Sequence, residues 1–482
     1  MTTFLISLAV LVGGYFLYGL LAEKIFGIDP SRETPAVRRA DGVDFVPMPT
    51  WRVFLIQFLN IAGLGPIFGA IMGVMFGPAA FLWIVLGTIF GGAVHDFISA
   101  MMSLRHDGES LPELVGRELG PVIKQILRVV SVLLLILVAA VFVVTPAGLL
   151  ADLTPGWADT IFWTAAIFLY YALATVVPVD KLIGRFYPVF GFALLFMAGG
   201  LLAVLLSGSV TVPDGMADGL YNRSGAGHPI FPMMFVSIAC GAISGFHATQ
   251  SPMMARCLKN ERLARPIFYG AMVAEGIVAL IWAAAAIAFT GGYDGLQSYM
   301  ASHSGAGALV HEISVSWLGA FGGVLALLGV IAAPITTGDT ALRSARLIIA
   351  DAAKIDQKKI LRRLLVCLPV FAGTIALMLI DFNVLWRYFA WTNQTLAAFT
   401  LWACTFYLAR KGKAYALTLV PALFMTVVVT SYILFAPAPE GFGLPLSVGV
   451  SAGLAIDVLC SLAFIRHLRR CAGARVDAQP SN

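Results

Sequence analysis

Polar and ionisable side chains interrupt four apolar stretches of this sequence, where they could bind a solute or an ion. They occur in the segments ACGAISGFHATQSP (239–252), GGAVHDF (91–97), FYGAMVAEG (268–276) and PITTGDT (334–340). A charged group within a lipid bilayer is costly, so it generally marks a substrate or ion pathway. These residue types therefore indicate reversible binding of a solute and a coupling ion.

Each acid in these stretches also has a structural explanation. Glu275 lies in the middle of its stretch and could carry a proton, or it could form a hydrogen bond to a neighbouring helix. Asp96 ends its stretch, where it could couple an ion or pair with a basic loop residue. Asp339 precedes Arg343 and Arg346 by one and two helical turns, so an ion pair explains it as well as a coupling role does.

Hydroxyl and imidazole groups complete the candidate set. Thr336 and Thr337 could ligate Na⁺ through their hydroxyl oxygens, or they could form hydrogen bonds between helices. His247 could titrate near neutral pH and gate a proton, with a hydrogen-bonded core histidine as the alternative. Asp457 lies in the last apolar stretch, where we expect a packing role.

The elements that must position these groups follow from the composition. Of 482 residues, 59% are hydrophobic and only 12% are charged, about half the charged fraction of an ordinary soluble chain. Apolar runs of about 20 residues, which can cross a bilayer as helices, follow one another with short breaks. We predict an all-α, polytopic membrane bundle of about thirteen spans, which begin near Phe4, Phe54, Ala79, Val129, Ile161, Val189, Ile230, Ile267, Trp317, Leu364, Val384, Tyr415 and Leu446.

The basic residues predict the orientation of these spans. With the N-terminus outside, all Lys and Arg residues except Arg223 and Arg387 fall in cytoplasmic connections or the C-terminal tail. Cytoplasmic loops carry such an excess of basic residues. We therefore expect a multi-pass protein with its N-terminus outside and its C-terminus in the cytoplasm. Phe4 to Leu21 lacks a basic leader and a cleavage motif, so we expect a first span there and not a removed signal peptide.

Two spans carry helix-breaking residues near their middle. The second reads FLNIAGLGPIFGA (58–70), with the breakers Gly63, Gly65 and Pro66. The seventh is ACGAISGFHATQSP (239–252), with the breakers Gly241, Gly245 and Pro252. They lie five spans apart, so they cross the bilayer in opposite directions. Interrupted helices at matching places in two inverted halves indicate the binding site of a secondary transporter. We expect the substrate at Asn60, Gly63, Gly65, Ser244, Gly245, His247, Gln250 and Ser251.

Several long motifs occur together in an order that is specific for one family. They are IAGLGP (61–66), GAVHDF (92–97), RHDGESLPEL (105–114), ACGAISGFHA (239–248), KNE (259–261), FYGAMVAEG (268–276), PITTGDTALRSARLIIAD (334–351) and WRYFAWTNQTLA (386–397). Through these motifs the chain resembles the carbon starvation protein A (CstA) family.

The resemblance implies an inner-membrane transporter induced on carbon limitation, which takes up peptides or, in related members, pyruvate with protons. It also implies kinship with amino acid–polyamine–organocation transporters and their five-plus-five inverted repeat. The single membrane domain, 1–482, then divides into an extra first span (1–26), repeat one (53–208), repeat two (229–411) and two C-terminal spans (414–468). PITTGDT falls where that superfamily often holds sodium.

This chain departs from the long members of that family near the second span. Those members carry two histidines where this chain has Ile56 and Gln57, and a small residue where it has Asn60. We therefore leave the substrate open between peptides and pyruvate-like carboxylates, and the coupling ion between H⁺ and Na⁺.

We predict a secondary active importer that is not an enzyme and works by alternating access. It has no Walker motif for ATP-driven transport. Two other kinds of function stay open. Ser244 and His247 could form the nucleophile and base of an intramembrane hydrolase, or the chain could be a channel or a nutrient sensor.

We expect no cofactor, no nucleic acid and no partner beyond the lipid bilayer and a small-molecule substrate; the oligomeric state stays open. The six cysteines are scattered, without a C-x-x-C pair. This spacing favours small core residues over a disulfide framework or a zinc site.

Overall fold

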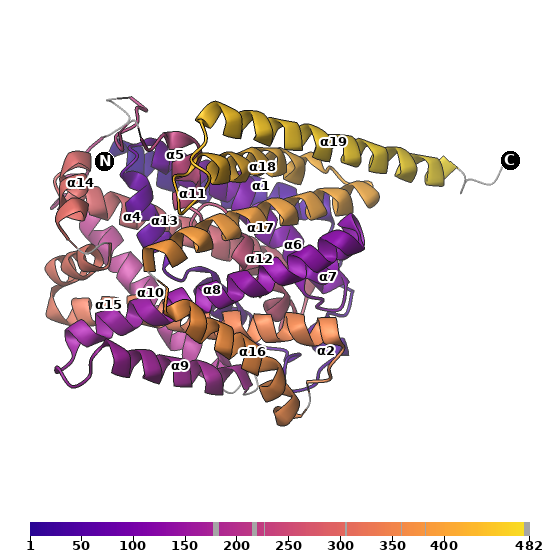
Figure 1. Cartoon of the computed structure of the whole chain (residues 1–482), viewed down its shortest axis with the longest axis horizontal. Coiled ribbons are helices and arrows are strands. Elements are labelled where there is room, and N and C mark those ends of the chain that lie inside the picture. Colours follow the sequence, from indigo (N-terminus) through magenta and orange to yellow (C-terminus); the bar gives the residue numbers. More distant parts are fainter. Residues whose placement is uncertain are drawn as a thin grey trace.

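The computed structural model describes residues 1–176, 183–214, 219–225, 227–303, 306–357, 359–380 and 382–476. Within these ranges the regular elements are all helical (Figure 1), so the predicted all-α membrane fold is confirmed. Lys181 and Lys358, two of the basic residues expected in cytoplasmic connections, lie outside the described residues.

The helices follow one another with short connections. In chain order they are α1 (Thr2–Phe26), α2 (Pro35–Arg38), α3 (Thr50–Ile61), the π-helical turn η1 (Gly65–Gly69), α4 (Ala70–Val74), α5 (Ala79–Leu86), η2 (Gly87–Gly92), α6 (Ala93–Arg105), α7 (Leu111–Leu119), α8 (Pro121–Leu153), α9 (Thr160–Val176), α10 (Ile183–Leu206), η3 (Ile230–Met234), α11 (Phe235–Ser237), α12 (Gly245–Ala255), η4 (Glu261–Leu263), η5 (Arg265–Tyr269), α13 (Gly270–Phe289), α14 (Tyr293–Ser302), α15 (Ala306–Ala353), α16 (Ile360–Met378), α17 (Phe382–Arg410), α18 (Ala416–Phe435) and α19 (Leu446–Val476).

Each of the thirteen expected starts falls in or beside a helix of the structure. Among the described residues, nine helices are long and apolar enough to span a membrane, and a bent pair that joins α3 to η1 and α4 makes a tenth. The other expected spans coincide with the shorter α9, with the interrupted segment from η3 to α12, and with α17. The total of thirteen and the division into repeats stay predictions.

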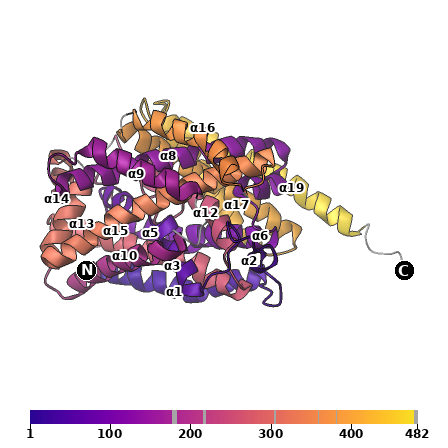
Figure 2. The ribbon, with the colours of Figure 1, turned by 90° about the horizontal axis from the view of Figure 1, so that it is seen from below.

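Large apolar side chains on the outer helices face away from the protein. Leu17 of α1, Ile161 of α9 and Leu379 after α16 are 78%, 77% and 85% exposed. α1 and α9 lie on opposite sides of the bundle (Figure 2). Such extensive exposed apolar surface is unfavourable in water and suits contact with lipid.

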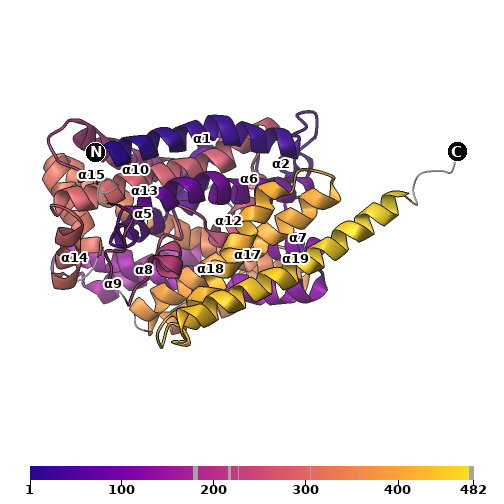
Figure 3. The ribbon, with the colours of Figure 1, turned by 90° about the horizontal axis from the view of Figure 1, so that it is seen from above.

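The start of α1 and the end of α19 lie at opposite ends of the long axis of the bundle (Figure 1). The short helices α2 and α7 lie toward the end where α19 finishes, whereas α14 lies at the end where the chain begins (Figure 3). The helices thus run mainly from one end to the other, as spans of a membrane do.

Both predicted helix interruptions are present, and they touch each other. The bent pair turns by 54° between Ile61 and Gly65, and the chain between Ser237 and Gly245 is not helical. A Cβ atom added to Gly65 would lie only 2.0 Å from the Cβ of Cys240. Glycine is therefore required there, because any side chain would separate the two breaks.

The interruption of the seventh span is shorter than the sequence indicated. Pro252 was expected to help break this helix, but it lies inside α12, which continues to Ala255. A proline removes one backbone donor, and the packing of α12 against α3, α6 and α17 retains the helix around it. His247, Gln250 and Ser251 therefore stand on a regular helix just after the break.

Candidate functional site

Side chains of the third predicted span hold the backbone of the seventh-span break. The Trp83 indole donates a hydrogen bond to the Ile238 carbonyl at 3.2 Å, and the Thr88 hydroxyl donates to the Gly241 carbonyl at 2.9 Å. Gly241 has a φ of +91°, which favours glycine. Backbone groups away from water need such partners, so these side chains stabilise the non-helical backbone at the break.

The N-terminus of α12 rests on Asn393 of α17. The Asn393 Oδ1 atom accepts hydrogen bonds from the Ser244 hydroxyl at 3.1 Å and from the Phe246 amide at 2.7 Å. A Cβ on Gly245 would lie 2.4 Å from the Asn393 carbonyl oxygen. The first amides of a helix lack partners within the helix, and here a side chain of another helix supplies one.

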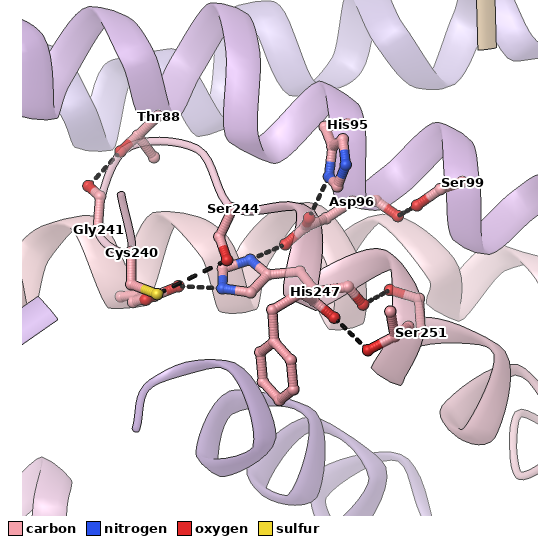
Figure 4. Close-up of polar contacts among 12 residues, drawn as sticks. Thr88, His95, Asp96, Ser99, Cys240, Gly241, Ser244, His247 and Ser251 are labelled. Carbon is pink, nitrogen blue, oxygen red and sulfur yellow. Dashed lines mark hydrogen bonds and ion pairs between the residues drawn. The ribbon is translucent and has the colours of Figure 1, made fainter. Parts of the chain in front are cut away.

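Asp96 joins two histidines in the interior. Its Oδ1 atom lies 2.8 Å from Nδ1 of His95 and its Oδ2 atom 2.9 Å from Nδ1 of His247 (Figure 4). All three side chains are fully buried. The expected role of Asp96 at the end of its span is therefore corrected in one respect: its partners are histidines within the bundle, and not a basic loop residue.

The opposite side of the His247 ring faces Glu275 of α13. The His247 Nε2 atom lies 3.5 Å from the Glu275 Oε2 atom. Cys240 belongs to the same group, since its sulfur, a His247 ring nitrogen and a Glu275 oxygen all lie within 4.8 Å of one another. The structure thus brings together Ser244, His247, Asp96 and Glu275, which were predicted from three separate segments of the sequence.

The last turn of α3 contributes polar groups without partners. The side-chain amides of Gln57 and Asn60 are fully buried, and neither has a hydrogen-bond partner among the described residues. A buried amide without a partner is unfavourable, so these groups fit a site that a polar solute completes. Gly63 lies just beyond them, and a Cβ there would be 3.2 Å from the Thr337 hydroxyl.

Thr336, Thr337 and Asp339 form a second polar group on α15. The Thr337 hydroxyl donates to the Leu59 carbonyl at 2.9 Å and the Thr336 hydroxyl to the Ala333 carbonyl at 2.8 Å. The Tyr187 hydroxyl contacts the Asp339 carboxylate. Thr337 therefore joins α15 to the first break, and tyrosine supplies a partner for Asp339 that the sequence did not indicate.

Gln250 and Ser251 bind groups of the protein itself. Gln250 donates from Nε2 to the Thr249 hydroxyl at 2.9 Å and accepts from the Ser344 hydroxyl at 3.4 Å. Ser251 donates to the His247 carbonyl at 3.0 Å. Their expected contact with substrate stays a prediction. Hydrogen bonds to the substrate would have to replace these bonds within the protein.

Charged residues close the end of the bundle that carries α2 and α7. Asp44 accepts a hydrogen bond from Arg346 at 3.0 Å and lies 3.9 Å from Arg343. Burial raises the pKa of Asp44, but the positive charges of Arg346, Arg343 and Arg256 outweigh it and leave this pKa below the usual value. Asp44 also lines a polar cavity of about 800 Å³ together with Arg256 and Asp351.

The family model described as carbon starvation protein CstA matches residues 1–162, 156–317 and 294–432. The chain belongs to the carbon starvation protein CstA family. The resemblance drawn from the sequence motifs is therefore confirmed.

Relatives in this family include named transporters. The chain is 30% identical over 339 residues to the pyruvate/proton symporter BtsT of Escherichia coli. The aligned region covers 57% of this chain and 47% of that protein. It is 28% identical over 381 residues to the peptide transporter CstA of Escherichia coli, with 64% and 54% covered. This chain therefore spans about half the length of these two relatives.

Two further proteins are similar in other ways. An uncharacterized membrane protein of Haemophilus influenzae is 44% identical over 338 residues, which cover 60% of this chain and 91% of that protein. A solved variant of the Eremococcus coleocola manganese transporter has a TM-score of 0.54 at 12% identity, over 90% of this chain and 98% of that one. This last likeness shows the fold, that of a membrane transporter.

Four side chains that contact the site were not predicted from the sequence. Trp83, Thr88 and Tyr187 carry no charge and stand in apolar stretches, so nothing local distinguishes them from packing residues. Asn393 had a signal, because the run TNQT places polar residues within an apolar helix, where polar groups are generally functional. Cys240 was expected to be a small core residue, yet its sulfur lies beside His247 and Glu275.

Proposed function

We propose that this chain is a secondary active transporter that imports small carboxylates, either pyruvate-like acids or peptides, across the bacterial inner membrane. The observation that supports this proposal is the contact of the two helix breaks at Gly65 and Cys240. Broken spans give a transporter free backbone groups at the middle of the bilayer, with half-helix N-termini suited to an anion. The names of the relatives point to the same substrates.

The substrate carboxylate would bind between the last turn of α3 and the start of α12. Asn60 has side-chain donors without a partner among the described residues, and it is fully buried. Ser244 lies on the other break, next to the amides of Gly245 and Phe246. Both groups are hydrogen-bond donors, which a carboxylate requires.

The coupling ion is H⁺ or Na⁺, and we place it at the group of Thr336, Thr337 and Asp339. The Leu59 carbonyl and the Thr337 hydroxyl, which lie 2.9 Å apart, supply the oxygen ligands that a hard cation prefers. The Asp339 carboxylate would bind either ion. A coupling role for Asp96 and Glu275 stays a prediction, because both surround His247 instead.

The charge distribution supports a topology with the N-terminus outside and the C-terminus in the cytoplasm. The end of the bundle with α2 and α7 carries Arg38, Arg105, Arg117 and Arg256, in agreement with the basic cytoplasmic side of membrane proteins. A reporter that works only in the cytoplasm should be active when it is fused to the C-terminus. Activity at the same position of a reporter that works only outside the cytoplasm would reverse this topology.

The hydrolase alternative has less support from the geometry. A serine nucleophile needs a base within hydrogen-bond distance. The Ser244 hydroxyl donates to Asn393, whereas the His247 ring nitrogens face Asp96 and Glu275. Covalent labelling of Ser244 by a fluorophosphonate would favour the hydrolase, and the proposal predicts no labelling.

The test is uptake by purified protein in proteoliposomes. We expect saturable uptake of labelled pyruvate or dipeptides that one inward gradient, of H⁺ or of Na⁺, accelerates. Counterflow without a gradient should persist in a carrier, whereas a channel shows no counterflow and a sensor binds without moving its ligand.

Asn60→Leu should abolish uptake, with the exposed-loop variant Asn222→Ala as control. Absence of gradient-dependent uptake for all substrates would overturn the proposal.

A further inference from the structure

Three metal-ligating side chains meet beside the seventh-span break. Cys240 lies in the break itself, His247 on the first turn of α12 and Glu275 on α13. One sulfur, one imidazole nitrogen and one carboxylate oxygen all lie within 4.8 Å of one another, and the three side chains are buried. Figure 4 shows the His247 ring between Cys240 and Asp96.

The spacing of these atoms fits joint ligation better than a hydrogen bond. His247 Nε2 and Glu275 Oε2 are 3.5 Å apart, whereas a charge-assisted N–H···O bond is about 2.7–2.9 Å long. Two ligands at about 2.0–2.2 Å from one tetrahedral metal are about 3.4 Å apart. Because the sulfur lies within 4.8 Å of both atoms, it would need to move inward by about 1 Å at most to complete such a site, given a metal–sulfur bond of about 2.3 Å.

Among the described residues, the ligand atoms of two of the three side chains form no hydrogen bond, whereas the Cys240 thiol donates to the Ser244 hydroxyl at 3.6 Å. Nε2 of His247 and both carboxylate oxygens of Glu275 lack hydrogen bonds among the described residues. Fully buried ionisable groups without partners are rare, because their desolvation is not offset. A dication at this point would offset the charges of a thiolate and a carboxylate together.

The surroundings orient the ligands as they do in known metal sites. Metal-ligating histidines generally donate their second ring N–H to a carboxylate. Here the Nδ1 atom of His247 is 2.9 Å from Asp96, which leaves Nε2 for the metal. Asn393 accepts two hydrogen bonds through its oxygen, so its amide nitrogen faces the Cys240 sulfur at 3.7 Å. That nitrogen can donate to a thiolate.

From this geometry we propose that Cys240, His247 and Glu275 bind a divalent transition-metal ion of the zinc class. Thiolate and imidazole ligands select such ions over Mg²⁺, Ca²⁺ and Na⁺. Three protein ligands leave a fourth position for water or an exogenous ligand, as in open zinc sites. The sequence spacing argued against zinc because the ligands come from two helices and a break. This binding does not depend on the proposed transport activity.

The test uses Co²⁺ as a spectroscopic probe on the purified full-length protein in detergent. We expect a thiolate-to-cobalt absorption band that saturates at one Co²⁺ per chain and disappears when Zn²⁺ is added. Cys240→Ser should remove this band, whereas Cys367→Ser, at a buried cysteine of the outer helix α16, should retain it. Glu275→Gln should weaken Co²⁺ binding at least tenfold.

A second variant separates metal binding from loss of folding. Asp96→Asn keeps the shape of the side chain and should weaken Co²⁺ binding about 10–100-fold while the band keeps its position, as for other outer-shell partners of metal ligands. No cobalt band in the wild-type protein, or an unchanged band in Cys240→Ser, would overturn the proposal. Neither readout involves uptake, so a failure of the transport proposal would leave this result standing.

Discussion

Gly65 and Cys240 approach so closely that a Cβ on the glycine would lie 2.0 Å from the Cβ of the cysteine. These two residues belong to different broken helices, which lie far apart in the sequence and meet at this point. The contact brings polar groups of α3, α12 and α13 close together in the buried interior of the bundle.

Gly65→Ala should abolish uptake and lower the melting temperature, because the added methyl group must displace Cys240. Overpacking of this kind costs about 1–3 kcal/mol. Gly199→Ala is the control, since a Cβ there has nothing within 4 Å. The measurements are thermal unfolding in detergent and proteoliposome uptake. Wild-type values for Gly65→Ala would show that the breaks do not need this contact.

Asn393→Ala should reduce uptake at least tenfold. The substitution leaves the Phe246 amide without its acceptor, and an unsatisfied buried donor costs about 1–3 kcal/mol. Asn393→Asp retains an acceptor oxygen and should unfold at a higher temperature than Asn393→Ala. If both variants transport and unfold alike, the support of α12 by Asn393 is not important for function.

Tyr187→Phe should uncouple transport from its driving ion. The variant removes the hydroxyl that contacts Asp339, so the carboxylate loses a partner while the ring remains. We expect gradient-driven accumulation to fall at least tenfold while counterflow continues. Tyr388→Phe is the control, because the Tyr388 hydroxyl binds the Pro439 carbonyl at the exposed end of α17. Equal loss of counterflow and accumulation in Tyr187→Phe would argue against a coupling role.

Asp44 should make stability depend on acid pH. The arginines around it hold its pKa below the ordinary value of 3.8 in spite of burial, whereas the carboxyl group in the unfolded chain has that ordinary value. Its contribution to stability is therefore fully present above pH 3.8 and is lost as the pH falls through the lower pKa of the folded state. The melting temperature of the wild-type protein should fall across that acid range.

Asp44→Asn should remove this part of the acid dependence. It should also destabilise the protein at neutral pH by about 3–5 kcal/mol, because Arg346 loses a buried partner. Asp356→Asn, in an exposed pair with Arg362, provides the control. If Asp44→Asn and the wild-type protein show the same acid profile, the arginines around Asp44 do not set that dependence.

The positions of the helix breaks could be predicted because they depend on local properties. Gly63, Gly65 and Gly241 weaken a helix wherever they occur, and breaks are present at both places. Pro252 shows the limit of this reasoning, since packing retains a helix around it. Asp339 shows another limit. The arginines that follow it along the helix could be found from the sequence, but the tyrosine of α10 that contacts its carboxylate could not.

The sequence alone determined that this chain is a helical membrane protein of the CstA type, because hydrophobicity over about 20 residues and contiguous motifs are properties of short segments. Only the tertiary structure decided which side chains meet. Cys240 lies within a break that periodicity cannot describe and His247 lies just after it, whereas Asp96, Glu275 and Asn393 come from three other helices. Their contacts depend on how the helices pack, and the order of residues along the chain does not contain that information in any local form. Gly65 is therefore predictable as a helix breaker and Cys240 as a core residue, but the contact between them is not predictable.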